Sequence, residues 1–445
     1  MVFRAGYAVA DINPDRSVPL AGTFSERMSE GVHDPLTAGA IVVDDGERTL
    51  GHVSMDLISA HGGITAAIRQ RVADEGLDVD AIMISTTHTH TGPELPGRHI
   101  DRRDAYDLDD VVERVIDGAV DAITLAADRR SAATIRTGRA ENRNVTINRR
   151  SRGGLLGEVD VAGRDVDEQR DVDPELSMLL IEPNNGSPVA LYNFPCHTTT
   201  MTSYEISADW PYFAAKRVKE EWPELHTSFI NGAAGDIVPR DSYDWQDTYE
   251  TKAAFSESIG TEIGESVTEA VVDAQTSSPV STPTVRSSER TVDLEVKHVN
   301  PTKVKTRREE LERKIEEEHL STERPLGHPI TREYEFLGRD LNLHEAADGF
   351  LSTTLQSMRI GPVTVISLPG EPLVDHGLDL KSRMDAPVPM IAGYTNDHLG
   401  YLPTPDEIAY GGYEVLTRKL SADGINKLRK TAFELASEVS IDGRS

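Results

Sequence analysis

Two histidines, His88 and His90, stand two residues apart in the stretch STTHTHTGPEL, directly behind the apolar run DAIMIS. In an extended segment, side chains two apart point the same way. Such a pair could share a metal ion, or one histidine could bind the ion while the other acts on its bound water. An H-x-H pair also occurs by chance, and the Asp that should follow it in a metallo-β-lactamase type of site is missing. The pair alone leaves the chemistry open.

Further polar residues follow other predicted strands. Cys196 and His197 come after VALYNFP, and Glu371 comes after VTVISLPG. Taken singly, His197 fits a hydrogen-bonded buried histidine better than a ligand. A carboxylate such as Glu371, placed after an apolar strand and a Pro-Gly turn, is costly to bury unless a positive group awaits it. Strand ends of an α/β sheet gather side chains at one edge, so two histidines and one carboxylate predict a catalytic zinc site with a position left for water.

The elements that must position these residues alternate in type over the first 280 residues. Apolar runs predict strands at 38–46, 48–58, 80–85, 175–183 and 188–195, and a strand followed by a turn within 226–237; helical spacing predicts helices at 63–76, 107–130 and 210–222. The alternation predicts an α/β fold with a central, partly parallel sheet flanked by helices. The same character returns from Leu351, with strands in 357–372 and 387–397 and a closing helix at 421–438.

Residues 285–350 read differently from the rest. After a predicted strand at 290–299, the segment 301–320 (PTKVKTRREELERKIEEEHL) is a charged helix with few apolar positions. A helix of this kind lies in solvent rather than in a core. We therefore expect one large domain over residues 1–445, with residues 285–350 as a charged helical insertion or arm.

The composition is strongly acidic. The 445 residues include 75 acidic and 46 basic side chains, for a formal charge of −29, and only 11 of the basic residues are lysines, none before Lys216. Such a charge repels nucleic acid and anionic membranes, which argues against both as partners. The balance resembles that of salt-adapted proteins from haloarchaea, because at molar salt a Debye length of about 3 Å screens the self-repulsion. An ordinary acidic cytosolic protein is the alternative.

The chain shows no export or membrane signal. Residues 1–14 (MVFRAGYAVADINP) contain one Arg and no apolar core long enough for a signal peptide, and no run approaches the roughly 20 apolar residues of a membrane helix. The single cysteine, Cys196, excludes an intrachain disulfide. We expect a soluble, cytoplasmic protein.

Several motifs, taken together and in order, resemble the neutral ceramidase family of zinc amidases. They are AGYAVADINP, GVHDPL, HTHTGPE, NRN, FPCHTTTM, ADWP, NGAAGDIVP, LPGEP and GYLPTPDEIAYGGYE. The resemblance covers essentially the whole chain and corresponds to that family's catalytic domain. It implies zinc ligation by His88, His197, Glu371 and Tyr401, the last of which spacing alone would not suggest.

The resemblance also implies catalytic roles for three further residues. His90 corresponds to the histidine that acts on the metal-bound water, Arg143 to the arginine of the family's Asn-Arg motif, and Tyr413 to its second active-site tyrosine. Two departures stand out: Val238 replaces a serine associated with the active site, and the Asn-Arg stretch continues as NRNV. From the sequence we also expect neither the export signal nor the C-terminal immunoglobulin-like domain common in the family.

The expected activity is hydrolysis of an amide bond in an N-acyl substrate by zinc-activated water. Zinc would lower the pKa of its bound water towards about 7. The substrate could be a ceramide-like lipid or a smaller N-acyl compound. Two alternatives remain: a metal-dependent esterase or phosphate hydrolase, for which a second metal would favour phosphate, and a zinc-binding homologue without activity. Oligomeric state stays open.

Overall fold

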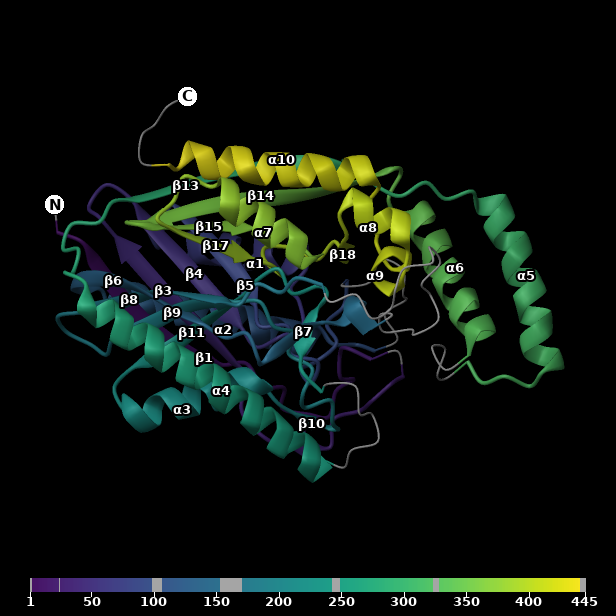
Figure 1. Ribbon diagram of the computed structural model, residues 1–445, viewed down its shortest axis with the longest axis horizontal. Coiled ribbons are helices and arrows are strands. Elements are labelled where there is room, and N and C mark those ends of the chain that lie inside the picture. Colours follow the sequence, from purple (N-terminus) through teal and green to yellow (C-terminus); the bar gives the residue numbers. More distant parts are fainter. Residues whose placement is uncertain are drawn as a thin grey trace.

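The computed structural model describes residues 2–23, 25–97, 106–152, 170–241, 249–322 and 328–440. Its largest element is an eight-stranded sheet (Figure 1). The strands run in the order β11 (His226–Asn231), β9 (Val189–Phe194), β8 (Glu175–Pro183), β6 (Ser131–Glu141), β1 (Arg4–Asp11), β3 (Thr37–Asp44), β4 (Thr49–Met55) and β5 (Ala81–Thr86). Only β4–β5 and β9–β11 are parallel pairs; the remaining pairs are antiparallel.

The large sheet consists of two halves joined by a short link. Strands β1 and β6 pair only through Arg4–Ala132 and Ala5–Ser131, so β1, β3, β4 and β5 form one half and β6, β8, β9 and β11 the other. A hydrogen bond of 2.6 Å from Ser54 Oγ of β4 to the Phe229 carbonyl of β11 ties the two halves together again. The halves therefore diverge from β1–β6 and meet once more at β4 and β11.

A second sheet packs against the first. It contains β13 (Val285–Glu295), β14 (Phe350–Ile360), β15 (Val363–Ser367) and β17 (Val388–Ala392). Buried residues of both sheets form one apolar cluster between them, including Ile41, Ile135, Leu179 and Val365. The fold is thus α/β with a partly parallel central sheet, as the sequence predicts.

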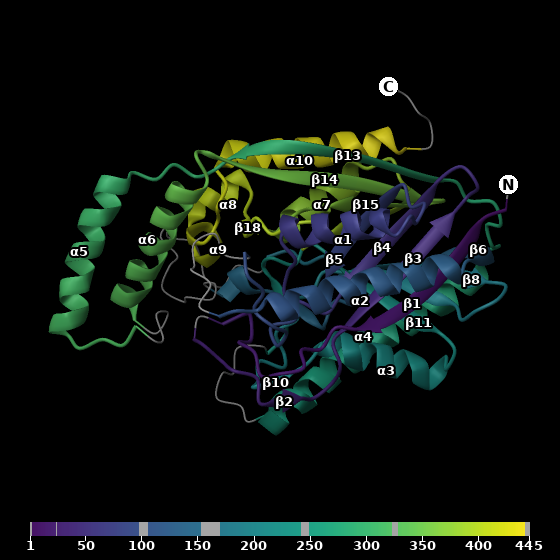
Figure 2. The same cartoon turned by 180° about the vertical axis from the view of Figure 1, so that it is seen from behind.

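Helices cover the outer faces of both sheets (Figures 1 and 2). The larger ones are α1 (Gly62–Asp74), α2 (Asp109–Asp128), α3 (Trp210–Glu221), α4 (Tyr249–Thr276) and α10 (Ala422–Glu438). Apolar clusters join α1 and α2 to the β3–β5 half, α3 and α4 to the β8–β9 half, and α10 to the second sheet. These helices bury the outer faces of the strands and hold their ends in fixed positions.

Short elements gather at one end of the large sheet. They are the strand pairs β2 (Gly31–Val32) with β10 (Glu205–Ile206), β7 (Thr146–Asn148) with β12 (Ile237–Pro239), and β16 (Glu371–Pro372) with β18 (Tyr401–Leu402), the 3₁₀ turn Arg149–Arg152, and the helices α7 (Val374–Arg383), α8 (Pro405–Tyr410) and α9 (Tyr413–Leu416). Most predicted site residues lie on or beside these elements.

The helices α5 (Pro301–Glu317) and α6 (Pro329–Ala346) stand beside one another, away from the sheets (Figure 1). Only Leu311 of α5 is buried, in keeping with the charged helix that the sequence predicts. Residues 285–295, the start of the predicted insertion, form β13, which pairs along its whole length with β14. The helices α5 and α6 lie between these two strands in the chain.

Among the described residues, no helix combines the length and the apolar character that crossing a bilayer requires.

Candidate metal centre

The turn after β5 presents His88. Its backbone has φ = 72°, a left-handed conformation that non-glycine residues rarely adopt, and its amide donates to the Leu57 carbonyl. Its Nδ1 lies 2.8 Å from the Ile58 carbonyl oxygen. The ring is buried and turned so that Nε2 points away from the strand.

His90 and His197 are held in the same way. Their Nδ1 atoms lie 3.0 Å from the Gly22 carbonyl and 2.6 Å from the Ala234 carbonyl. A carbonyl can only accept, so each Nδ1 carries the proton and each Nε2 keeps its lone pair. This use of main-chain carbonyls to orient imidazoles is typical of metal-binding histidines.

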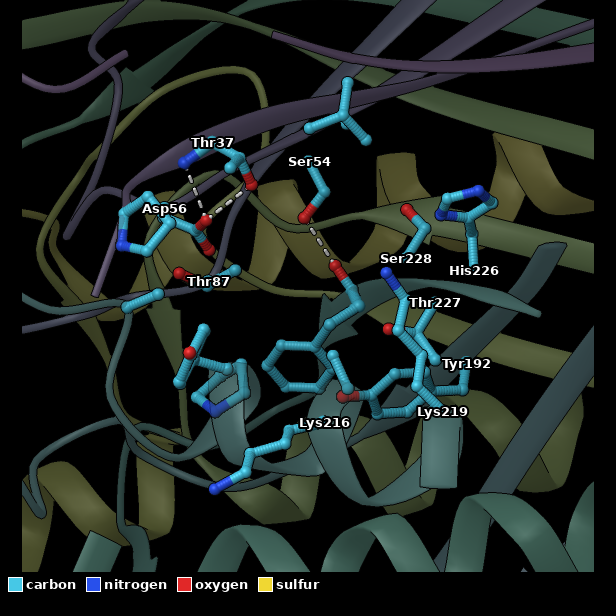
Figure 3. Close-up of a pocket in the computed structure, with 18 of the residues that line it drawn as sticks. Thr37, Ser54, Asp56, Thr87, Tyr192, Lys216, Lys219, His226, Thr227 and Ser228 are labelled. Carbon is cyan, nitrogen blue, oxygen red and sulfur yellow. Dashed lines mark hydrogen bonds between the residues drawn. The ribbon is translucent and has the colours of Figure 1, made fainter. Parts of the chain in front are cut away.

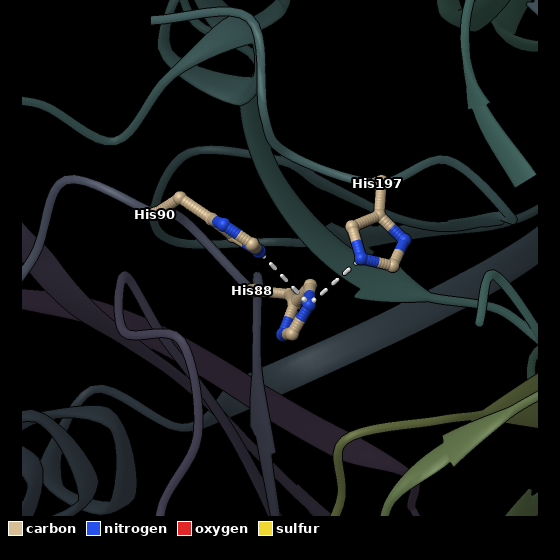
Figure 4. A group of neighbouring side chains, drawn as sticks. All are labelled: His88, His90 and His197. Atoms are coloured by element: carbon tan, nitrogen blue, oxygen red, sulfur yellow. Dashed lines mark hydrogen bonds between the residues drawn. The ribbon is translucent and has the colours of Figure 1, made fainter. Parts of the chain in front are cut away.

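The three Nε2 atoms converge (Figure 4). His88 Nε2 lies 3.2 Å from His197 Nε2 and 3.2 Å from His90 Nε2, and the ligand atoms of all three residues fall within 4.8 Å of one another. Two lone pairs cannot form a hydrogen bond with each other. The convergence of three such atoms therefore suits a cation.

Glu371, the first residue of β16, adds a carboxylate to this cluster. Its Oε2 lies 3.4 Å from His88 Nε2 and 3.7 Å from His197 Nε2. Among the described residues no group donates a hydrogen bond to this buried oxygen. Ligand atoms of a tetrahedral zinc with bonds of about 2.0–2.1 Å lie roughly 3.4 Å apart, so the spacings of these three residues fit one ion.

The electrostatics agree with this donor set. Burial would raise the pKa of Glu371, but the neighbouring His88, His398 and His197 rings outweigh it and hold that pKa well below its usual range. Burial, together with His88 and Arg149, lowers the pKa of His197 well below its usual range. Glu371 is therefore ionised and His197 neutral, the protonation states that metal binding requires.

The two predicted tyrosines lie next to Glu371. Tyr401 pairs in register with Glu371 in the β16–β18 ladder, and the ring of Tyr413 lies edge-to-face against that of Tyr401, with centroids 5.5 Å apart. Burial and the Glu371 carboxylate raise the pKa of both hydroxyls. Both phenols are therefore protonated at neutral pH and can donate hydrogen bonds.

Arg143 does not join this group. Its side chain is 67% exposed and pairs with Glu141 at 3.0 Å, so the structure places the predicted catalytic arginine on the surface. The buried arginine at the cluster is Arg149, whose guanidinium carbon lies 5.4 Å from the Tyr401 ring centroid and 5.7 Å from that of Tyr413. The sequence contains the Asn-Arg pair twice, at 142–143 and 148–149, and the second pair is the signal that identifies Arg149.

Arg149 is fixed by a buried ionic network. Its Nε lies 2.7 Å from Glu414 Oε1 of α9, and Arg150 binds both Glu414 and Glu407 of α8 at 2.6 Å. These contacts connect the 3₁₀ turn to α8 and to α9, the helix that begins at Tyr413. They give Arg149 and Tyr413 a common rigid support.

Two further residues lie close to the cluster. His398 Nε2 is 3.9 Å from Glu371 Oε1. The ring of Tyr394 lies over that of His88 at a centroid distance of 4.0 Å, and its buried hydroxyl has no hydrogen-bond partner among the described residues. Sequence patterns do not point to Tyr394, since they predict one strand over 387–397, whereas β17 ends at Ala392 and Tyr394 has φ = 55°.

Asp209 and Val238 lie near the cluster, but their side chains are not part of it. Asp209 caps α3 through the Trp210 amide, and its carboxylate also binds Thr200 and the Met201 amide in the loop that follows His197. Val238 lies buried in β12 and brings no hydroxyl to the site.

The fold and the cluster together define an α/β protein whose strand ends gather a metal-type ligand set. The family described as neutral/alkaline non-lysosomal ceramidase, N-terminal, matches residues 3–306. The chain therefore belongs to this family, which confirms the resemblance drawn from its motifs.

Known proteins agree with this assignment. A neutral ceramidase from Pseudomonas aeruginosa is 28% identical over 257 residues, which are 53% of this chain and 37% of that protein. The aligned part is thus little more than a third of the relative's length. The crystal structure of neutral ceramidase from Pseudomonas aeruginosa shares the fold, with a TM-score of 0.76 at 19% identity over 100% of this chain and 76% of that one. A structure of ceramidase complexed with C2 gives 0.74 at 19% identity over 98% and 75%.

Proposed function

We propose that this chain is a zinc-dependent hydrolase that cleaves the amide bond of an N-acyl substrate, as a ceramidase does. The observation that carries the proposal is the convergence of His88 Nε2, His197 Nε2 and Glu371 Oε2 within 3.2–3.7 Å, where two neutral imidazole lone pairs and a carboxylate oxygen face one another. Family membership supplies the reaction class.

His88, His197 and Glu371 would hold the ion, with Tyr401 as the fourth ligand. When bound, zinc supplies a Lewis acid that polarises a carbonyl and makes hydroxide available near neutral pH. Two neutral imidazoles and one carboxylate form a common catalytic zinc set. The position of Tyr401 beside Glu371 in the β16–β18 ladder supports its inclusion.

His90 would carry the proton. Its Nδ1–H is tied to the Gly22 carbonyl, so Nε2 is its only site for taking up a proton. An imidazole can accept the proton of the attacking water and return it to the leaving amine, because its pKa lies near neutrality. Since Nε2 is 3.2 Å from His88 Nε2, a proton taken at this atom stays at the reacting centre.

Tyr413 and Arg149 would stabilise the oxyanion that forms when the amide carbonyl is attacked. Both are rigidly held beside Tyr401, and each offers a donor in a buried site. One such donor is typically worth about 3 kcal/mol. Arg149 takes the role first predicted for Arg143.

A ceramide-like lipid is the substrate class that family membership favours, and a smaller N-acyl compound would need the same chemistry. An esterase would also need only one ion. Phosphate hydrolysis usually employs two metals, and the described residues contain one histidine cluster of the metal-binding type, which favours acyl over phosphoryl transfer.

The experiment that tests the proposal measures zinc and activity in the same samples. Elemental analysis of the purified protein should give one zinc per chain, and Glu371→Gln should remove it. An N-acyl panel with varied acyl length and head group, assayed with added zinc, should show amide cleavage by the parent chain and none by Glu371→Gln. Full zinc retention by the variant would refute the ligand assignment, and inactivity of the zinc-loaded parent on every amide would refute the amidase.

A further inference from the structure

Apart from the metal centre, a cavity lies in the wedge between the two halves of the large sheet, under α3 (Figure 3). Its volume is about 440 Å³. Strands β1, β3 and β4 form one wall, β9 and β11 the opposite wall, and α3 the cover. The residues that line it include none of His88, His90, His197 and Glu371; Thr87, one residue before His88, is its nearest approach along the chain.

One side of the cavity is cationic. Lys216 and Lys219, one turn apart on α3, line it together with His226 at the start of β11. They are the only lysines in the first 251 residues of a chain with a formal charge of −29. A positive charge at one opening attracts anions that the acidic surface as a whole repels.

Lys219 is the cation that is available to a ligand. Lys216 is directed towards Glu257 of α4, whose carboxylate lies 2.9 Å from its Nζ, and away from His226 (Figure 3). No carboxylate of the described residues lies within ion-pairing distance of Lys219. Burial, Lys219 and Arg129 lower the pKa of His226, and Glu224 opposes them.

The wall of the cavity holds an unsatisfied hydroxyl. Ser228 is 4% exposed, and its Oγ has no hydrogen-bond partner among the described residues. Leaving such a group unpaired typically costs about 1–3 kcal/mol. Ser228 lies two residues beyond His226 on β11, so both side chains face the same side of the strand (Figure 3).

The far end of the cavity is polar but nearly neutral. Asp56 lies there beside Thr37 and Thr87 (Figure 3), and its Oδ2 accepts hydrogen bonds from the Thr37 amide and hydroxyl. Burial raises the pKa of Asp56 to about 7. Its carboxyl therefore opposes an anion less than an ordinary aspartate would.

We propose that this cavity binds a small organic anion that also carries hydroxyl groups. Its anionic group lies at Lys219 and His226, and one of its hydroxyls bonds to Ser228. A sugar acid, with a carboxylate, and a sugar phosphate share this chemistry. The site is separate from the metal centre and does not depend on the hydrolytic reaction.

Calorimetric titration of the full chain tests the proposal, at the lowest salt concentration that keeps the protein folded. Gluconate and glucose 6-phosphate are the two probes, and the tighter of them identifies the source of the anionic group. Sorbitol, which lacks the charge, and hexanoate, which lacks the hydroxyls, should bind more weakly than the better probe. Sorbitol binding as tightly as that probe, or no binding by either anion, would overturn the proposal.

Variants locate the site. Lys219→Gln should weaken binding of the better probe about tenfold, the value of one charge-assisted hydrogen bond, whereas Lys430→Gln on α10 makes the same charge change outside the cavity and should leave binding intact. Ser228→Ala should weaken the hydroxylated probe and leave hexanoate unaffected. Unchanged binding in both cavity variants would refute the assignment.

A zinc-free control separates this site from the metal centre, because both probes also bind zinc. Glu371→Gln should bind the better probe as the parent does. Loss of binding in that variant would place the anion at the metal centre and overturn the proposal, whatever the outcome of the amidase assay.

Discussion

The chain contains two Asn-Arg pairs, and by sequence either arginine could be the one proposed to stabilise the oxyanion. The fold distinguishes the two candidates. The sequence cannot distinguish 142–143 from 148–149, because the two pairs lie six residues apart in a stretch for which the sequence predicts neither strand nor helix. In the structure Asn148 closes β7, and its side-chain amide donates to Asp236 Oδ2 while the Arg149 amide donates to the Asp236 carbonyl. These contacts turn Arg149 inward and leave Arg143 outside.

We expect Arg149→Gln to lower kcat/KM roughly 100-fold, the cost of losing one oxyanion donor. Arg143→Gln should leave it unchanged, since its ion pair with Glu141 is exposed. Removing Arg149 also takes away one of the two arginine partners of Glu414, so zinc content and circular dichroism must show that the variant is folded. An equal loss in both variants would contradict the assignment of Arg149.

Asp56 predicts a pH effect on stability. Its pKa is raised by burial from 3.8 to about 7 in the folded protein, so between these values the folded state keeps a proton that the unfolded state has released. Its contribution to stability is therefore fully present below about pH 4 and is lost as the pH rises through about 7. Its full size is roughly 4 kcal/mol at most.

Asp56→Asn removes this titration and keeps an oxygen for Thr37. In urea unfolding, the free energy of unfolding of the parent chain should fall relative to the variant as the pH increases from 4 to 7. The exposed Asp121→Asn on α2 serves as the matched control. A constant difference between parent and Asp56→Asn over this range would exclude a raised pKa.

At the scale of elements, the strand ends were predictable and the turns after them were not. Apolar runs identify β5, β9 and β15. His88 follows β5, His197 follows β9 and Glu371 follows β15, each within a few residues. These positions suffice to predict the cluster. The left-handed backbone of His88 and Tyr394 has no sequence signature, because positive φ is uncommon for every residue type except glycine. The two-residue ladder of β16 with β18 is likewise too short to show periodicity.

The segment around Gly22 shows how an element outside the cluster controls it. Gly22 has φ = 91°, and a Cβ there would lie 2.4 Å from His90 Cγ. Gly22→Ala should displace the His90 ring and lower kcat by the roughly 10²–10⁴-fold typical of general acid–base catalysis. Zinc content should be retained, because Gly22 contacts none of the proposed ligands. Loss of zinc in this variant would instead make His90 a ligand.

At the scale of the molecule, the charge of −29 should govern stability through salt. Self-repulsion among the surface carboxylates is screened as the Debye length falls to about 3 Å at 1 M salt. We expect the midpoint of thermal unfolding to rise continuously with KCl up to molar concentrations. Equal osmolality supplied by sucrose is the control for non-ionic effects. A midpoint that no longer rises above physiological salt would identify an ordinary acidic protein.

The whole-molecule architecture also explains which part of the arm could be predicted. The charged helix α5 can be predicted from the sequence because almost none of its residues is buried. The sequence places β13 in the same insertion because the pairing of β13 with β14 is non-local. The first pair, Val285 and Ile360, is separated in the chain by the entire arm. Composition indicates whether a segment is buried, but it does not identify the distant strand that pairs with it.

Peptide oxygens from Ile58, Gly22 and Ala234 set the orientation of the three imidazoles. Every residue type brings the same oxygen, so a mutational scan will find the imidazoles intolerant and two of their three anchors permissive, with Gly22 the exception for steric reasons. The path of the main chain therefore determines the geometry of this centre. A divergent relative can keep that geometry even where nearly every surrounding side chain has changed.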